Sequence, residues 1–339
     1  MNNRSEYNRS NRRSRSSTKS RPGRHSADGG RAVAVHYVRP KKHLGQHFLT
    51  DSGTAARIAA GLTGYGAYTH LIEVGAGTGI LTRHLLDLPH RLWLSEVDEQ
   101  SIAHLIHHLQ VNPAAILGDF LRLDLGSLLR GLGPSGGNSA NHRAPAEEEM
   151  PERLRLGAVK DVSGASAEVP NVPQIGVVGN FPYHISSQIL FRVLEQKQYI
   201  PEMCGMFQRE VAQRICAPPD NKTYGILSVL TQAYYQAEYL FTVNEGVFNP
   251  PPKVKSGVIR LQRLPQPADC DESLLRRLVK AGFNQRRKRL GNALKTVLPV
   301  DYPDALRLMD LRAEQLSVDL FVALARDLAQ YIQDSSDNI

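Results

Sequence analysis

The chain has 339 residues, of which 41% are hydrophobic and 22% charged. These proportions are typical of globular proteins and exclude a wholly disordered or collagen-like chain. No apolar run approaches the roughly 20 residues that a membrane-spanning helix needs, so we expect no membrane partner. The three cysteines, Cys204, Cys216 and Cys270, lie far apart and indicate neither a disulfide framework nor a zinc site. They favour a reducing, cytoplasmic location.

Positive charge is concentrated at the amino terminus. Residues 1–42 hold twelve Lys or Arg and two acidic residues, which is a net charge of +10. Because the whole chain has a net charge of +8, the remaining residues sum to −2. Residues 1–38 are rich in Arg, Ser, Asn and Gly and have too few large apolar side chains to build a core, which predicts a disordered basic tail. A solvated tail, an RNA-sampling arm and a targeting signal are all compatible with this composition.

Strands and helices alternate over residues 39–264, which predicts an α/β domain with a parallel sheet and helices on its faces. In chain order the expected elements are strand His70–Val74, helix Gly79–Leu88, strand Leu92–Val97, helix Ser101–Leu109, and strands Ala114–Leu117 and Ile175–Gly179. Residues 126–173 contain five prolines and interrupt the alternation, so we predict a mobile insertion there. Residues 265–339 have helical spacing and predict a smaller, all-helical carboxyl-terminal domain.

A glycine-rich turn, Gly75-Ala76-Gly77-Thr78-Gly79, follows the first expected strand and opens a helix. Glycines allow a tight turn and close approach of a ligand to the backbone. A dinucleotide site would have the spacing G-x-G-x-x-G, but Ile80 stands in place of the third glycine. The loop therefore favours S-adenosylmethionine, an adenosyl ligand without phosphates, over a nicotinamide cofactor or a purely structural turn.

Acidic residues follow the next two expected strands, at the edge where open α/β sheets bind ligands. Glu96 comes 19 residues after Gly77, and its carboxylate can accept both ribose hydroxyl protons. Asp98 could take that role instead, and either residue could simply be a surface carboxylate. Asp119, after the third strand, is placed to accept a hydrogen from the adenine amino group of the cofactor.

The tetrapeptide Asn180-Phe181-Pro182-Tyr183 follows the fourth expected strand. The exocyclic amine of adenine is a poor nucleophile, because its lone pair is conjugated into the ring. The Asn180 oxygen and a nearby carbonyl can accept both amino hydrogens and direct that lone pair, while Pro182 fixes the backbone and the Tyr183 ring stacks on the base. The methyl group of a sulfonium donor is already electrophilic, so we expect no metal.

Together these motifs resemble the KsgA-type ribosomal RNA adenine N6,N6-dimethyltransferases, from about Lys41 to Leu298 without the insertion. Three further segments carry the resemblance: Lys42–Leu49, Phe248–Val254 and Phe283–Lys288. The resemblance implies a set of cofactor-binding residues, namely His47, Leu49, Gly75, Glu96, Asp119 and Asn180. It implies a catalytic pocket formed by Asn180, Pro182, Tyr183 and Phe248. Ala76 replaces the proline expected in the glycine loop, and neither the tail nor the insertion has a counterpart in the family.

The resemblance also implies a fold and an activity. The fold is a Rossmann-like class I S-adenosylmethionine-dependent methyltransferase sheet with a smaller helical domain. The activity is N6,N6-dimethylation of two adjacent adenines in the 3′-terminal hairpin of small-subunit (16S) ribosomal RNA, with a role in small-subunit biogenesis. The partner would be that RNA or the assembling 30S subunit, and we expect a cytoplasmic monomer.

Three alternative functions remain. The first is that of the related large-subunit ribosomal RNA adenine methyltransferases, against which the helical domain and the Phe283–Lys288 motif argue. The second is a DNA adenine methyltransferase. The third is an assembly or transcription factor without catalysis, which would not need the intact glycine loop, Glu96, Asp119 and the tetrapeptide.

The stretch from Arg276 to Lys295 contains eight Lys or Arg and no acidic residue. Four of these cations are consecutive, Arg286, Arg287, Lys288 and Arg289. Like charges so close together repel one another, so an anionic partner explains them better than a solvated helix face does. We therefore predict that residues 265–339 bind RNA phosphates without reading sequence, and that specificity comes from RNA shape and an unpaired target loop.

Overall fold

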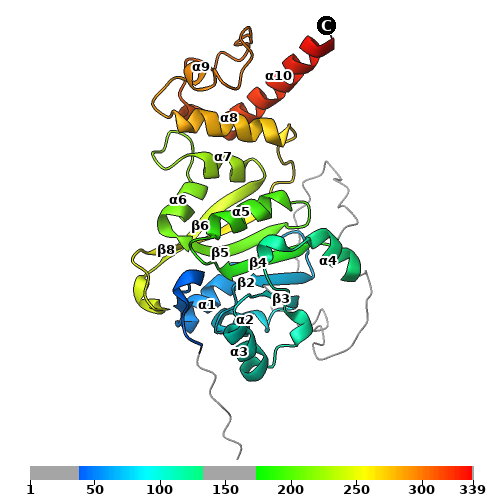
Figure 1. The fold of residues 1–339 in the computed structure, drawn as a ribbon, viewed down its shortest axis with the longest axis vertical. Coiled ribbons are helices and arrows are strands. Elements are labelled where there is room, and N and C mark those ends of the chain that lie inside the picture. Colours follow the sequence, from blue (N-terminus) through cyan, green and yellow to red (C-terminus); the bar gives the residue numbers. More distant parts are fainter. Residues whose placement is uncertain (1–37, 133–172, 338–339) are drawn as a thin grey trace, which may run out of the picture. The chain divides into compact units, whose positions relative to one another are not determined.

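The computed structural model describes residues 38–132 and 173–337 (Figure 1). The predicted tail, except for Val38, and most of the predicted insertion lie outside the described residues. The first residues of that insertion belong to helix α4 (Leu125–Leu132), in which Leu125 and Leu129 are fully buried. None of the helices in the two described ranges is long and apolar enough to cross a membrane.

The central sheet has six strands in the order β3-β2-β4-β5-β8-β6. Four neighbouring strands are parallel: β3 (Arg91–Ser95), β2 (His70–Val74), β4 (Ile175–Asn180) and β5 (Glu202–Gln208). The two remaining strands, β8 (Ser256–Arg263) and the edge strand β6 (Tyr235–Val243), are antiparallel to their neighbours. The carboxyl ends of β2, β3 and β4 therefore meet at one edge, where an open α/β sheet binds ligands.

The strand expected at residues 114–117 is reduced to a single bridge between Leu94 and Ile116. The chain instead forms a short 3₁₀ helix, Pro113–Ala115, and the Asn112 side chain accepts a hydrogen bond from the Ala114 N–H (2.9 Å). Proline has no N–H to donate to a strand ladder, and asparagine favours a turn, so the local sequence opposes the strand.

Helices cover both faces of the sheet, because alternate residues of each strand point to opposite sides. One face packs against α1 (Ser52–Ala59) and α2 (Ile80–Leu85). The other packs against α4, α5 (Ser186–Glu195), α6 (Arg209–Ile215) and α7 (Ile226–Gln232). Helix α3 (Glu99–Leu109) forms a smaller cluster with β3, in which Leu94 and Leu105 are buried.

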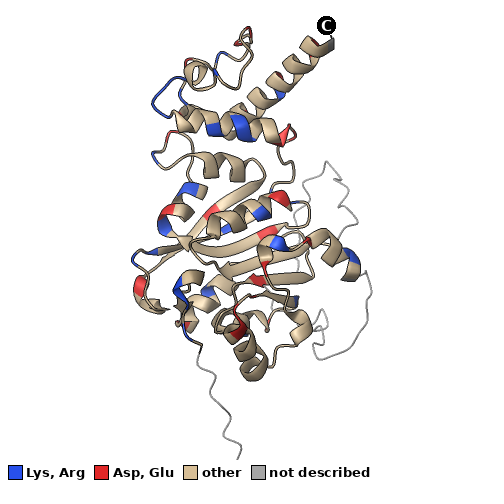
Figure 2. Cartoon of the chain, viewed as in Figure 1, with Lys and Arg blue, Asp and Glu red and all other residues tan. Residues whose placement is uncertain are grey.

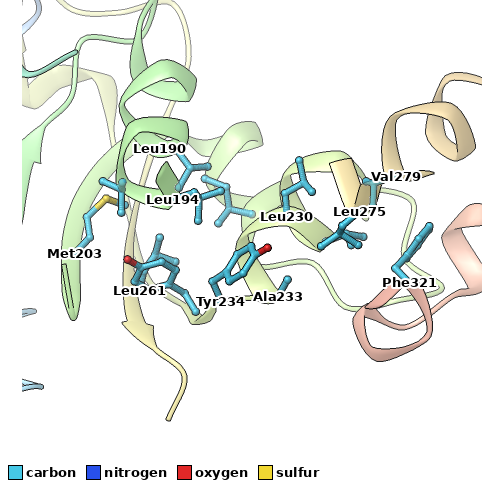
Figure 3. Packing of buried hydrophobic residues seen from close by; sticks show 14 of the residues in the cluster. Leu190, Leu194, Met203, Leu230, Ala233, Tyr234, Leu261, Leu275, Val279 and Phe321 are labelled. Carbon is cyan, nitrogen blue, oxygen red and sulfur yellow. The ribbon is translucent and has the colours of Figure 1, made fainter. Parts of the chain in front are cut away.

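Beyond residue 264 the chain forms α8 (Glu272–Asn284), α9 (Leu290–Ala293) and α10 (Val318–Asp337). The apolar core continues from the sheet into these helices without a break (Figure 3). Leu194 and Met203 lie at the sheet end of this cluster, Leu230 lies on α7, and Val279 and Phe321 lie on α8 and α10. The helical region and the sheet therefore stabilise one another through shared buried surface.

A second, two-stranded sheet lies outside the main one. Its strands are β1 (Phe48–Leu49) and β7 (Phe248–Asn249), which are antiparallel and about 200 residues apart in sequence. This pairing holds the segment before α1 next to the connection that leads to β8.

Candidate active site

A cavity of about 220 Å³ lies at the carboxyl ends of β2, β3 and β4. Its lining contains seven of the nine cofactor and catalytic residues expected from the sequence: His47, Gly75, Glu96, Asp119, Asn180, Pro182 and Tyr183. The two others, Leu49 and Phe248, do not line it. They are buried partners across the β1–β7 ladder, in an apolar cluster with α1 and α2. Phe48, which was not singled out, lines the cavity in place of Leu49.

The glycine loop adopts left-handed backbone conformations, with φ of +76° at Gly75, +56° at Gly77 and +75° at Gly79. Only glycine adopts this region without strain. A Cβ atom on Gly77 would lie 2.9 Å from the Phe48 ring, and one on Gly79 would lie 2.7 Å from Leu109 of α3. The glycines thus serve both the turn and the packing of Phe48 and α3 against it.

Glu96 is buried, and its carboxylate is held by three backbone N–H groups. The Gly77 N–H donates to Oε2 (2.8 Å), while the Val97 and Asp98 N–H groups donate to Oε1 (2.8 and 2.9 Å). Burial raises the pKa of Glu96, although these hydrogen bonds oppose the rise. A carboxylate has about four acceptor positions, so Oε2 keeps one for a ribose hydroxyl, fewer than the two expected from the sequence.

Asp98 has a different set of partners and does not line the cavity. Its side chain is fully buried and accepts hydrogen bonds from Lys41 Nζ, from Gln46 Nε2 (3.3 Å) and from Ser101 Oγ (3.0 Å). Burial alone would raise the pKa of Asp98, but these donors outweigh it and lower the pKa. Asp98 therefore holds the 41–46 segment against the start of α3, and Glu96 is the better candidate for the ribose.

Asp119 lies at the cavity edge as the first residue before a 3₁₀ helix, Phe120–Arg122. Its Oδ1 atom accepts a hydrogen bond from the Leu121 N–H (3.0 Å), and its Oδ2 atom lies 3.4 Å from Arg122 Nε. The carboxylate is partly exposed, so acceptor positions remain for a ligand amine.

A chain of contacts links the tetrapeptide to the 44–48 segment and to the start of β8. Asn180 Nδ2 donates to the His47 carbonyl (3.1 Å), and the His47 ring stacks on the Tyr183 ring with centroids 5.6 Å apart. His47 Nδ1 donates to the Pro250 carbonyl (2.7 Å). The Tyr183 hydroxyl is hydrogen-bonded to Ser256 Oγ (2.5 Å), and burial raises the pKa of Tyr183, so this hydroxyl stays protonated near neutral pH.

This arrangement orients the Asn180 amide. Because its nitrogen is engaged by the His47 carbonyl, its oxygen is the acceptor that remains for the cavity. The Pro182 carbonyl accepts from the Ile185 N–H (3.1 Å), which leaves that oxygen one further acceptor position. Two acceptors for the hydrogens of an amine are therefore available within the tetrapeptide.

Glu73 is a buried acid beside the site that the sequence reasoning did not single out; it does not line the cavity. It lies in β2 just before the glycine loop, is fully buried, and accepts a hydrogen bond from Thr82 Oγ1 (2.6 Å). Burial raises the pKa of Glu73 to about 8, and the nearby Glu96 carboxylate adds to the rise. The signal for it was an acidic residue inside an otherwise apolar strand.

The four consecutive cations after α8 have unequal surroundings. Arg286 Nε lies 3.4 Å from Glu314 Oε2, and its Nη2 donates to the Asn221 carbonyl (3.2 Å). Arg289 pairs with Asp310 (2.7 Å). Arg287 and Lys288 are exposed, and within the two described ranges neither forms an ion pair.

A mostly parallel sheet, a glycine loop after its first strand and a buried acid after its second define a class I S-adenosylmethionine-dependent methyltransferase. The chain belongs to the ribosomal RNA adenine dimethylase family, whose model matches residues 38–332. It is therefore a methyltransferase with S-adenosylmethionine as its cofactor, as the sequence predicted.

Two relatives are each called ribosomal RNA small subunit methyltransferase A. The protein from Cytophaga hutchinsonii is 43% identical over 299 residues, which cover 86% of this chain and 98% of that protein. The protein from Parabacteroides distasonis is 41% identical over 308 residues, which cover 90% of this chain and 100% of that protein.

Two solved structures share the fold. A dimethyladenosine transferase from Plasmodium falciparum has a TM-score of 0.59 at 19% identity, with 86% of this chain and 98% of that chain covered. The 23S rRNA methyltransferase ErmE has a TM-score of 0.52 at 21% identity, with 84% and 100% covered. These likenesses confirm the predicted fold class.

The residues that line the cavity fit the cofactor. The glycine loop allows close approach to the backbone, Glu96 Oε2 has an acceptor position left for a ribose hydroxyl, and Asp119 can accept from an adenine amine. When bound, the cofactor supplies a methyl group made electrophilic by the adjoining sulfonium. The chain's own task is to hold and aim the acceptor amine.

Proposed function

We propose that this enzyme transfers methyl groups to N6 of two adjacent adenines in the 3′-terminal hairpin of small-subunit ribosomal RNA. The name shared by its relatives supports the RNA subunit, and the resemblance of its motifs supports the base and the hairpin. The observation that carries the proposal is the hydrogen bond from Asn180 Nδ2 to the His47 carbonyl, which leaves the amide oxygen for a target amine.

The chemistry follows from this orientation. The Asn180 oxygen and the Pro182 carbonyl each accept one hydrogen of the adenine amine, which draws its lone pair out of conjugation and towards the methyl group. After the first transfer the nitrogen releases one proton to water and keeps one hydrogen, so a single acceptor suffices to hold it for the second. Positioned acceptors of this kind act mainly through geometry and electrostatics.

The Tyr183 ring provides the surface on which the target base stacks. One face of this ring packs against His47, and the hydroxyl is held by Ser256, so the ring is fixed before the base arrives. A stacked base is worth about 1–3 kcal/mol. Since a base must leave its helix stack to reach such a pocket, an unpaired loop adenine is the favoured substrate.

The helical region supplies contacts to the RNA backbone. Figure 2 shows Lys and Arg on the connection between α8 and α9, where Arg287 and Lys288 are exposed. Cations that neutralise phosphates add affinity without reading sequence. We propose that residues 265–339 bind RNA, that the enzyme acts as a cytoplasmic monomer, and that its partner is the assembling small subunit, whose maturation it assists.

Transfer of labelled methyl from the cofactor to purified, unmodified small subunits tests the proposal, with mass spectrometry to locate the modified bases. We expect two dimethylated adenines in the 3′-terminal hairpin. Large subunits and duplex DNA serve as alternative substrates. Label on either of these, and none on small subunits, would contradict the proposal in favour of the corresponding activity.

A further inference from the structure

The connection between β7 and β8 presents one apolar side chain between two cations. Val254 is 44% exposed, and Lys253 and Lys255 on either side of it are also exposed. The residues that bracket this triplet, Pro252 and Ser256, are both buried. Lys253, Val254 and Lys255 therefore form a run of three exposed side chains between two buried residues.

Hydrogen bonds anchor the chain on both sides of this triplet, next to the partner of the Tyr183 hydroxyl. The Pro250 carbonyl accepts from His47 Nδ1 (2.7 Å), and the Lys255 carbonyl accepts from the Arg209 N–H (2.9 Å). Ser256 Oγ is bonded to the Tyr183 hydroxyl and pairs in the sheet with β5. Val254 is two residues from Ser256, so their Cα atoms are within about 7 Å.

The other exposed apolar side chains of the described residues have different settings. Val97 is 54% exposed but lines the cofactor cavity next to Glu96. Tyr65 donates its hydroxyl to the Arg263 carbonyl, at the opposite end of the sheet from the cavity. The three others, Val300, Leu306 and Ile332, lie in the helical region. Among these exposed apolar residues of the described ranges, only Val254 lies two residues from Ser256, the hydrogen-bond partner of the Tyr183 hydroxyl.

A base that leaves its stack creates a gap between its neighbours, and proteins that unstack nucleic acids fill such gaps with rigid apolar side chains. We propose that Val254 is the wedge that takes the place of the target adenine in the RNA, while Lys253 and Lys255 contact the phosphates on either side. This role rests on the proposed function, because it presupposes an RNA adenine drawn into the pocket. Val254 is then a positioning residue: it contacts the bases on either side of the gap and so keeps the target adenine out of the stack.

The test compares three hairpin RNAs in single-turnover methylation: the intact hairpin, and two versions that each lack one base flanking the adenine pair. Removal of a neighbouring base abolishes the stack that a wedge must open. We expect Val254→Ala to slow methylation of the intact hairpin by about tenfold or more, and to slow at least one base-deficient hairpin less than twofold. Val254→Ile should retain the wild-type rate on all three.

The outcomes separate the two proposals. Equal losses on all three hairpins would mean that Val254 supports the loop and not the unstacking step, and no loss on any would mean that it contributes nothing; both overturn the wedge. Wild-type enzyme that methylates none of the three would overturn the proposed function itself, and the wedge with it. Cofactor affinity, measured by calorimetry, should be the same for the wild type and for Val254→Ala.

Discussion

The side-chain nitrogen of Asn180 donates a hydrogen bond of 3.1 Å to the main-chain carbonyl of His47, which lies 133 residues earlier in the chain. His47 in turn stacks on Tyr183, and its ring donates to the Pro250 carbonyl. Segments that lie far apart in the sequence therefore position one another around the tetrapeptide. The Asn180 oxygen, which is the acceptor for the target amine, is therefore oriented by His47. That residue belongs to the 44–48 segment, which lines the cofactor cavity.

Replacement of Asn180 by alanine removes that acceptor and the bond to His47. Loss of one preorganised polar group in a catalytic site costs on the order of 100–1,000-fold in turnover, and we expect a loss of that size here. Single-turnover methylation of the hairpin measures it. Cofactor affinity should fall much less than turnover; a fall of the same size would mean that Asn180 acts mainly in holding the cofactor.

Tyr183→Phe keeps the stacking ring but loses the bond to Ser256. The buried hydroxyl of Ser256 then lacks its partner, which costs about 1 kcal/mol of stability, so we expect a lower melting temperature and a methylation rate within about fivefold of wild type. Tyr183→Ala loses the ring and should cost about 10–100-fold in rate.

Ser256→Ala is the matched control for that variant, because it breaks the same hydrogen bond from the other side. It should reproduce the effect of Tyr183→Phe, and the double variant should be little worse than either one. A Tyr183→Phe enzyme as inactive as Asn180→Ala would show that the hydroxyl takes part in the chemistry.

Glu96 and Asp98 should differ in their effects on the cofactor. Glu96→Gln loses a charged acceptor, and hydrogen bonds to charged groups contribute about 1.5–3 kcal/mol, so the Kd for S-adenosylmethionine should rise about 10–100-fold. Asp98→Asn weakens the contacts with Lys41 and Gln46 but touches no cavity surface, and should change the Kd by less than about fivefold. Calorimetric titration of both variants decides between them, and the reverse order would make Asp98 the ribose ligand.

Glu73 should make stability depend on pH. Its folded-state pKa of about 8 lies above the ordinary value of 4.5, so the folded protein holds a proton that the unfolded chain has lost. Its contribution to stability is therefore fully present below pH 4.5 and is lost as the pH rises through about 8. Glu73→Gln, which cannot ionise, should gain stability relative to wild type by up to about 1.4 kcal/mol per pH unit across this window.

Denaturant unfolding of the wild type and of Glu73→Gln at pH 6, 7, 8 and 9 measures that difference. Comparison at each pH removes the contribution of the titrating groups that do not interact with Glu73. A difference that stays constant with pH would mean that Glu73 is ionised in the folded protein throughout.

Much of the site was predictable because its residues follow neighbouring parallel strands. Gly75 and Glu96 come directly after a strand, and Asn180 is the last residue of one. Parallel topology brings those strand ends to one edge whatever the length of chain between them. The fold class follows from the same alternation. The strand expected at 114–117 failed because a proline and an asparagine at its start favour a turn over extended pairing.

The contacts that sequence reasoning missed join distant segments. Nothing local to Asp98 indicates Lys41, which engages its carboxylate from 57 residues away, so Asp98 remained an alternative to Glu96 as the ribose ligand. The β1–β7 pairing, which turns Leu49 and Phe248 away from the cavity, spans about 200 residues. The number of cations in a segment likewise does not show which of them have acidic partners in the fold, as Arg286 has in Glu314.

The four cations after α8 should differ in their contribution to RNA binding, because, in the part of the chain that the structure describes, Arg286 and Arg289 face acidic residues and Arg287 and Lys288 do not. Arg287 and Lys288 are exposed without an ion pair, so alanine at either should weaken RNA binding and lower the log–log slope of affinity against salt by about 0.7–0.9. Arg286 instead compensates Glu314, whose Oε2 atom is buried and has no hydrogen bond.

Alanine at Arg286 should therefore lower the melting temperature and change the salt slope less than alanine at Lys288 does. Glu314→Gln removes the charge that Arg286 faces, and in that background Arg286→Ala should cost less stability than it does alone. Fluorescence titration of the hairpin at several salt concentrations, with thermal unfolding of the same proteins, measures both quantities. An Arg286→Ala enzyme that loses as much salt slope as Lys288→Ala, at unchanged melting temperature, would show that Arg286 leaves Glu314 to contact a phosphate when RNA binds.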